Sequence, residues 1–161
     1  MGLRYRSVQQ SGFFFITTST LGLIRRFTHP IDFEMLENNI EFYRQREKAA
    51  ISSYVIMPNH FHLTIFIPEK ASISNFMRDL KRRTAREYFE LYNMPYGRLW
   101  ENRFDDLSLF TDHAYKIKLN YIHMNPVKAG LVEKPEDWIY SSTRLYMFGE
   151  KRIIKISAIE I

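Results

Sequence analysis

Residues 54–69 read YVIMPNHFHLTIFIPE, an apolar and β-branched run that holds two of the five histidines of the chain. Such a run favours a buried β-strand, and Pro68 predicts where this strand ends. Side chains two residues apart lie on the same face of a strand, so His60 and His62 share one face while their apolar neighbours occupy the other. The stretch therefore predicts a strand with one packed face and one face that presents two imidazoles.

The segments before and after this strand carry helix and strand patterns in turn. Residues 12–20, GFFFITTST, are rich in aromatic and β-branched side chains and predict a first strand, which the Thr/Ser/Gly run through Gly22 ends. Residues 29–50 and 71–93 place apolar side chains at helical spacing and predict two helices, the second with Leu91 on or near its buried side. Ser72 or Ser74 is the expected cap of that second helix.

A third strand is expected at residues 107–112, followed by a third helix. Asp112 is the expected cap of this helix, and Pro126 disfavours helical geometry in the residue before it, so we expect the helix to end near Asn125. The order β-α-β-α-β-α, without repeats, predicts a sheet covered by helices on at least one face. Residues 133–161 form a polar and aromatic tail whose place in the fold the pattern does not predict.

The composition limits the class of protein. With 161 residues and a hydrophobic content of 45%, we expect residues 1–161 to form one well-buried domain. No window is apolar enough to span a membrane, and residues 1–10 lack the apolar core of a secretory signal, so we expect a cytoplasmic protein. Since there is no cysteine, any metal must bind to histidine, carboxylate or amide groups. The net charge of +5 favours a polyanionic partner.

Two neutral imidazoles on one rigid strand offer a platform for a divalent metal ion that needs one or two further oxygen or amide ligands. The alternative is that His60 and His62 are two partly exposed histidines on an open sheet face. A second segment favours the metal site. Residues 120–132 read NYIHMNPVKAGLV and place Tyr121 and Asn125 four residues apart, on one face of a helix. The Tyr121 hydroxyl would then lie beside an amide ligand, unless Tyr121 packs as an ordinary tyrosine.

Four segments in this order, MPNHFH, WENRF, YIHMNPVKAGLV and DWIYSS, resemble the single-tyrosine HUH transposases, especially the REP-associated tyrosine transposases. The resemblance extends over roughly residues 12–142. It implies an α+β fold with a ferredoxin-like or RRM-like antiparallel sheet, helices packed on one face, and the helix of the nucleophile beside the sheet. It also implies that His60, His62 and Asn125 are metal ligands. Tyr121 occupies the position of the nucleophile.

The activity that this resemblance implies is metal-dependent cleavage and rejoining of single-stranded DNA, by a transposase or a domesticated relative. The tyrosine attacks the phosphorus, the 3′ hydroxyl leaves, and a 5′-phosphotyrosine remains until another 3′ hydroxyl reverses the step. Mg²⁺ or Mn²⁺ is the implied cofactor, because either ion would polarise the scissile phosphate. The implied partner is single-stranded or hairpin DNA, with no membrane, and the protein would act as a monomer or a homodimer.

Basic residues recur along the predicted helix at 71–93 and in the loop after it. Arg78, Arg82 and Arg86 lie four residues apart and give one flank of the helix a strong positive charge, which suits phosphate contacts or is simply a solvated face. Aromatic residues beside arginines in the loop would stack on unpaired bases, or else form a hydrophobic plug. The candidate DNA-binding residues are Arg78, Lys81, Arg82, Arg86, Arg98, Trp100, Arg103 and Phe104.

Two other functions fit parts of the pattern. A non-catalytic module that binds nucleic acid would use the same sheet and the same charge, but it would need neither Tyr121 nor both histidines. A metal hydrolase that activates water at His60 and His62 would cleave its substrate without leaving a covalent adduct. A gel of the protein with a labelled oligonucleotide separates the transposase from the hydrolase.

Overall fold

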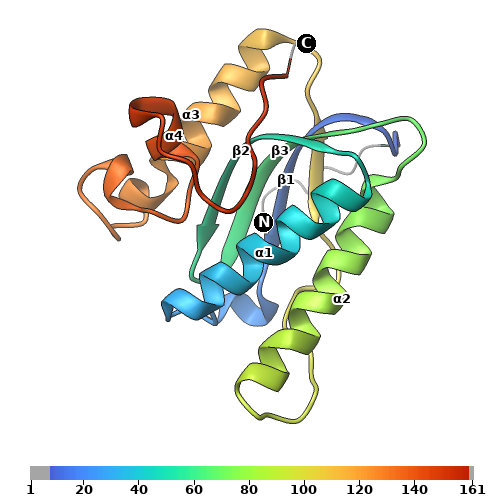
Figure 1. Cartoon of the computed structure of the whole chain (residues 1–161), viewed down its shortest axis with the longest axis vertical. Coiled ribbons are helices and arrows are strands. Elements are labelled where there is room, and N and C mark those ends of the chain that lie inside the picture. Colours follow the sequence, from blue (N-terminus) through green and yellow to red (C-terminus); the bar gives the residue numbers. More distant parts are fainter. Residues whose placement is uncertain (1–7, 160–161) are drawn as a thin grey trace.

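The computed structural model describes residues 8–159. The expectation that residues 1–10 lack a secretory signal falls mostly on residues 1–7, which lie outside the described residues. A four-stranded antiparallel sheet with strand order β2-β3-β1-β4 lies between two layers of helices (Figure 1). No helix of the described part is long and apolar enough to cross a membrane. The elements are β1 Gly12–Ser19, η1 Leu21–Leu23, α1 Pro30–Arg46, β2 Ala50–Met57, β3 His60–Ile67, α2 Ile73–Leu91, β4 Asp105–Ser108, α3 Asp112–Lys128, η2 Pro135–Asp137 and α4 Thr143–Phe148.

Alternation along the strands divides the apolar side chains between two cores. Phe61 and Leu63 of β3 belong to the larger core, which the sheet forms with α1 and α2. On the other face, Phe13 and Phe15 of β1 pack with Ile122 of α3. The expected α+β class with an antiparallel sheet is confirmed, and the β-α-β-β-α-β order is that of ferredoxin-like proteins. Helices nevertheless cover both faces, since α3 lies across the face opposite α1 and α2 (Figure 1).

The single strand predicted through the histidines is wrong, because the segment forms two strands. Met57 of β2 pairs with His60 of β3 across a turn made of Pro58 and Asn59. Proline has no N–H and suits a turn position, which accounts for its place just before the histidines. The backbone carbonyl of Asn59 accepts a hydrogen bond from the Thr20 N–H at 2.9 Å, so the turn is fixed to the end of β1. The two histidines therefore lie at the start of β3.

The first two helices and the last strand keep their predicted places with shifted ends. α1 ends at Arg46, because Lys48 adopts a φ of 53° and turns the chain into β2. α2 is capped by Ser72, whose hydroxyl accepts a backbone hydrogen bond at 3.4 Å. Leu91 is 42% exposed, so its expected place on the buried side of α2 is wrong. β4 begins two residues before the strand predicted at 107–112.

Both ends of α3 differ from the prediction. Thr111 is the N-cap in place of Asp112, because its hydroxyl accepts a backbone hydrogen bond from the first turn at 3.1 Å. The helix passes through Asn125 and Pro126 and ends at Lys128. A proline in the last turn removes only one backbone hydrogen bond, which is a smaller loss than a proline in mid-helix causes. Asn125 therefore keeps a helical position and a fixed direction.

The tail after α3 lies along the β2 edge of the sheet. Tyr140 stacks on Phe33 of α1 with ring centroids 3.9 Å apart, and Ile156 forms a parallel bridge with β2. Arg152 donates two hydrogen bonds, at 2.8 and 2.6 Å, to the fully buried carboxylate of Glu37 in α1. The tail therefore closes the larger core beside β2.

Candidate active site

Four side chains converge where the start of β3 meets α3. The amide of Asn125 lies between the two imidazoles, with Oδ1 3.2 Å from His60 Nε2 and Nδ2 3.5 Å from His62 Nε2. The ring of Tyr121 meets that of His62 edge-on, with centroids 5.2 Å apart. The two histidine rings are themselves 4.9 Å apart. The fold thus brings together the two histidines, the tyrosine and the asparagine that the sequence singled out.

Residues of β1 fix the orientation of this centre. Thr17 pairs with His62 across the sheet, and its Oγ1 lies 2.8 Å from His62 Nδ1. Phe15, two residues earlier on the same face, stacks on the His62 ring at 5.3 Å and meets the Tyr121 ring edge-on at 5.8 Å. Tyr121 and Asn125 are one helical turn apart on α3, so both point at the same strand end. The centre is therefore held from the sheet and from the helix.

Burial keeps both imidazoles neutral. Desolvation holds the pKa of His62 well below its usual range, and the neighbouring His60 and Lys118 lower it further. Desolvation also lowers the pKa of His60. The sequence predicted a strand face that presents both imidazoles, but His62 is only 3% exposed, whereas His60 is half-buried. Neutral imidazoles retain the lone pairs that bind a metal ion.

The surroundings of His60 suit a cation. Its Nδ1 lies 2.7 Å from Asn59 Oδ1, and its Nε2 lies 3.2 Å from Asn125 Oδ1. A neutral imidazole has one N–H and donates to only one of these two oxygens. With the proton on Nδ1, the lone pair of Nε2 faces the lone pairs of the Asn125 amide oxygen, and the two atoms repel each other. A cation bound to both atoms would remove this repulsion. Residues 8–159 contain no group of three or more His, Cys, Asp or Glu placed to hold a metal, so a metal here relies on two imidazoles and an amide oxygen.

Tyr115, at the start of the same helix, lies apart from this centre. Its ring packs on that of Phe13 with centroids 5.4 Å apart, and its hydroxyl lies 3.1 Å from that of Tyr146 in α4. These contacts join α3 to β1 and to the tail. Of the two tyrosines, only Tyr121 contacts a histidine of the centre.

Most of the candidate DNA-binding residues line one groove of about 640 Å³ between α2 and the loop at residues 94–104. Arg82 is exposed and forms no ion pair within the described residues. Lys81 is half-buried, its Nζ donates to the carbonyl oxygen of Glu101 at 2.6 Å, and burial lowers its pKa to about 8. The groove therefore has cationic walls over a partly apolar floor. The candidates that line it are Arg78, Lys81, Arg82, Arg98, Trp100 and Phe104.

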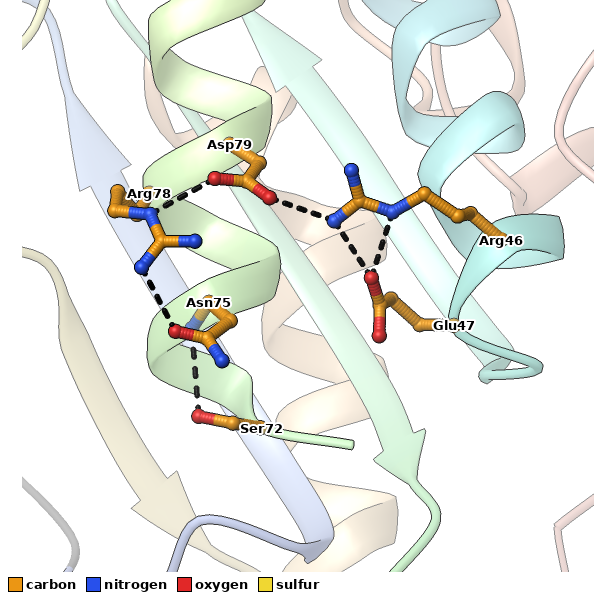
Figure 2. Close-up of polar contacts among 6 residues, drawn as sticks. All are labelled: Arg46, Glu47, Ser72, Asn75, Arg78 and Asp79. Atoms are coloured by element: carbon orange, nitrogen blue, oxygen red, sulfur yellow. Dashed lines mark hydrogen bonds and ion pairs between the residues drawn. The ribbon is translucent and has the colours of Figure 1, made fainter. Parts of the chain in front are cut away.

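Arg78 also belongs to a charge network between α1 and α2 (Figure 2). Its guanidinium donates to Asp79 at 2.8 Å and to Asn75 at 3.0 Å, and Asp79 accepts a further hydrogen bond from Arg46 of α1 at 2.7 Å. The hydrogen bonds from Arg78 and Arg46 hold the pKa of Asp79 below its usual range. Arg78 therefore connects the groove to the contact between the two helices.

Three candidates are buried, ion-paired or outside the groove. For Trp100 the sequence left base stacking and a hydrophobic plug open; it is 5% exposed, its indole N–H donates to Thr84 at 2.9 Å, and its ring packs on Phe27. Trp100 is thus the hydrophobic plug under the loop. Arg86 is ion-paired on α2 outside the groove. Arg103 lines a second cavity, of about 350 Å³, at the end of β1.

A family model described as "Transposase IS200 like" matches residues 25–125, which is more than half of the chain. The match contains both histidines and Tyr121, and it ends at Asn125. The chain belongs to this family. The resemblance to single-tyrosine transposases is therefore confirmed at the level of the family.

Two curated proteins are similar to this chain. The REP-associated tyrosine transposase of Escherichia coli K12 is 25% identical over 111 residues, which cover 68% of this chain and 64% of that protein. A Haemophilus influenzae protein, provisionally named as a REP-associated tyrosine transposase, is 32% identical over 96 residues, which cover 54% of each chain. The chain thus spans between half and two thirds of the length of these relatives.

Solved structures of transposases share the fold of the chain. One is a REP-associated tyrosine transposase bound to a REP hairpin, with a TM-score of 0.74 and 22% identity over 100% of this chain and 94% of that one. Another, from Deinococcus radiodurans, has been described as a transposase and has a TM-score of 0.54, with 17% identity over 75% of this chain and 95% of that one. At these identities the likeness establishes the fold.

Several residues that surround this centre were missed from the sequence. Thr17 and Phe15 contact His62 only through strand pairing, which the sequence does not reveal. Asn59 stands directly before His60, yet its role depends on the turn that was read as strand. Lys118, three residues before Tyr121, did carry a usable signal, because that spacing places it on the same face of the helix as Tyr121.

Proposed function

We propose that this IS200-like transposase cleaves and rejoins single-stranded DNA through a covalent bond to Tyr121, as an active transposase or a domesticated relative. The observation that carries the proposal is the position of Tyr121 against His62, with the Asn125 amide between the two imidazoles. A module that only binds nucleic acid has no need for a phenol, an amide and two neutral imidazoles at one point.

The chemistry follows from the tyrosine. Its oxygen forms a bond to the scissile phosphorus as the bond from phosphorus to the 3′ oxygen breaks, and the phenol loses its proton while the 3′ hydroxyl gains one. The product is a 5′-phosphotyrosine, whose ester stores the energy needed for rejoining. Phe15 and the helix position of Tyr121 hold the ring at one place, which keeps the attacking oxygen in line for both directions of the reaction.

His60, His62 and Asn125 are the residues that would hold a divalent ion, Mg²⁺ or Mn²⁺. Nitrogen ligands favour Mn²⁺ over Mg²⁺. A bound ion supplies Lewis-acid polarisation of the scissile phosphate. Thr17 and Asn59 would orient the two imidazoles by holding Nδ1 of each ring, which leaves both Nε2 atoms directed at the Asn125 amide.

The substrate that we propose is single-stranded or hairpin DNA. The groove beside α2 has four cationic side chains together with aromatic ones such as Tyr96 and Phe104, a combination that suits unpaired nucleotides. A structural neighbour is bound to a REP hairpin, which supports a hairpin next to the unpaired segment. The cationic residues that line the groove are Arg78, Lys81, Arg82 and Arg98.

The test is a denaturing gel of the protein with an oligonucleotide taken from the flanks of its own gene, in the presence of Mn²⁺. We expect a covalent species that carries a 3′ label and not a 5′ label. Tyr121→Phe removes one oxygen and should bind DNA without forming the species, whereas the matched control Tyr115→Phe should retain it. Cleavage without any covalent species in the wild type would favour the water-activating hydrolase, and binding without cleavage would favour the non-catalytic module.

A further inference from the structure

Two lysines of α3 flank the ring of Tyr121. Lys118 precedes Tyr121 by three residues and Lys128 follows it by seven, a spacing that places all three on one face of the helix. The Nζ atom of Lys118 lies 5.5 Å from the centroid of the Tyr121 ring and 4.6 Å from that of Phe15. The Nζ atom of Lys128 lies 5.6 Å from the Tyr121 centroid. Two ammonium groups are therefore held beside the phenol that the proposed function makes the nucleophile.

Neither ammonium forms an ion pair with a carboxylate in the part of the chain that the structure describes. Lys116, on the same helix, provides the contrast, because its Nζ pairs with Asp112 at 2.5 Å. A lysine in the last turn of a helix is favourable for the helix dipole, which accounts for a charge at Lys128. A lysine stem also covers apolar surface, which accounts for Lys118 over Phe15. The attraction of an ammonium to an aromatic ring accounts for their position at Tyr121, and it leaves both positive charges without a counter-ion among the described residues.

The local charge balance calls for an anion. Within residues 8–159, the rings and cations that contact the Tyr121 ring belong to Phe15, His62, Lys118 and Lys128, and none of these side chains carries a negative charge. The positive charge beside Tyr121 is therefore not compensated by the centre itself. A phosphodiester brings one negative charge on two non-bridging oxygens, which suits two separate ammonium donors.

We propose that Lys118 and Lys128 bind the non-bridging oxygens of the scissile phosphate and hold its phosphorus over the oxygen of Tyr121. This assignment rests on the proposed function and adds two catalytic residues to it. The phosphate keeps its negative charge when the bond from phosphorus to the 3′ oxygen is exchanged for the bond to Tyr121. The same two lysines therefore serve cleavage and rejoining, and they stabilise the charge that builds up on the phosphate during either step.

The first measurement is the rate of adduct formation under single-turnover conditions. Lys118→Met and Lys128→Met keep an apolar stem and should each slow the adduct by about 100-fold, as the loss of one donor to a developing oxyanion does. Lys118→Arg should recover a large part of the rate, because it restores the charge. Lys116→Met, the control on the same helix, should react like the wild type. Equal rates for the Lys118, Lys128 and Lys116 variants would overturn the assignment while leaving the proposed function in place.

The second measurement needs no cleavage and uses Tyr121→Phe protein. An oligonucleotide with a neutral methylphosphonate at the cut position lacks the charge that the lysines are proposed to bind. Lys118→Met and the methylphosphonate should each raise the dissociation constant. When both changes are combined, the dissociation constant should rise less than the product of the two separate factors, by about threefold or more. Independent effects would mean that Lys118 does not contact this phosphate. If the wild type forms no adduct on any strand, the proposed function fails. In that case the methylphosphonate is moved along the strand, and effects independent of Lys118→Met at every position would overturn the lysine assignment as well.

Discussion

Arg82 and Arg83 are adjacent on α2 and provide a sharp test of the proposed DNA groove. Arg82 lines the groove and is in no ion pair within the described residues, whereas Arg83 donates to Glu87 at 2.9 Å and covers the ring of Phe42. If unpaired DNA lies in the groove, Arg82→Ala should weaken binding and Arg83→Ala should not. The sequence alone pointed to Arg86 as the partner of Arg82, but Arg86 lies outside the groove and is paired with Glu90.

The magnitude follows from the four cationic side chains that line the groove. Each phosphate contact on a single strand releases about 0.7 counterions, so with four contacts the affinity falls about 600-fold when the salt concentration rises tenfold. With three contacts the fall is about 130-fold. The slope of log affinity against log salt should therefore be smaller by about 0.7 for Arg82→Ala and unchanged for Arg83→Ala.

The assay is fluorescence anisotropy of a labelled single strand, at pH 7 and at several salt concentrations, on protein that also carries Tyr121→Phe so that the strand stays intact. A slope for Arg82→Ala equal to that of the wild type would show that Arg82 contacts no phosphate and belongs to a solvated surface. The same slope change in Arg82→Ala and Arg83→Ala would show that general charge, rather than the groove, attracts the DNA.

Three further predictions concern the metal site, the groove lysine and the tail. His60→Ala should lower Mn²⁺ affinity, seen by electron paramagnetic resonance, on the order of tenfold or more while leaving the circular dichroism spectrum intact, and unchanged Mn²⁺ affinity would remove the metal assignment. Lys81 loses its proton near its lowered pKa of about 8, so the affinity for single-stranded DNA should fall as the pH rises from 7 to 9. Lys81→Arg keeps its charge and should flatten this dependence. An equal fall of affinity in Lys81→Arg would exclude Lys81 as the source of the pH dependence. Arg152→Ala leaves the buried Glu37 carboxylate without its cation and should cost about 3 kcal/mol of unfolding free energy in urea; a loss below about 1 kcal/mol would show that the tail adds little to the core.

The two halves of the active centre were predictable because each depends on a local period. Side chains two apart share a strand face, which pairs His60 with His62, and side chains four apart share a helix face, which pairs Tyr121 with Asn125. Neither period says that α3 lies against β3. That expectation came from the resemblance of the motifs to a family, and the packing of α3 on the sheet realises it.

The hairpin was missed for a physical reason. Helices cover both faces of the sheet, so β2 and β3 are buried on both sides and read as one continuous apolar run. The turn residues Pro58 and Asn59 were the available signal. The burial of Trp100 was not predictable from its neighbours, because it depends on the loop after α2 folding back until the indole reaches Thr84.

The position of the tail was also outside the reach of local patterns. Arg152 contacts Glu37, and Tyr140 contacts Phe33, although each pair is separated by more than a hundred residues of sequence. Such contacts are set by the completed sheet and its edge, since β2 is the strand that the tail covers.

The central claim, that Tyr121 is the nucleophile, is tested most directly by locating the covalent bond. The wild-type protein is incubated with Mn²⁺ and its cleavable strand, digested with nuclease and trypsin, and analysed by tandem mass spectrometry. The account predicts a nucleotide attached through its 5′ phosphate to Tyr121, on the peptide Leu119–Lys128, and an unmodified Tyr115. A nucleotide on any other residue, or complete cleavage of the strand with no modified peptide, would contradict it.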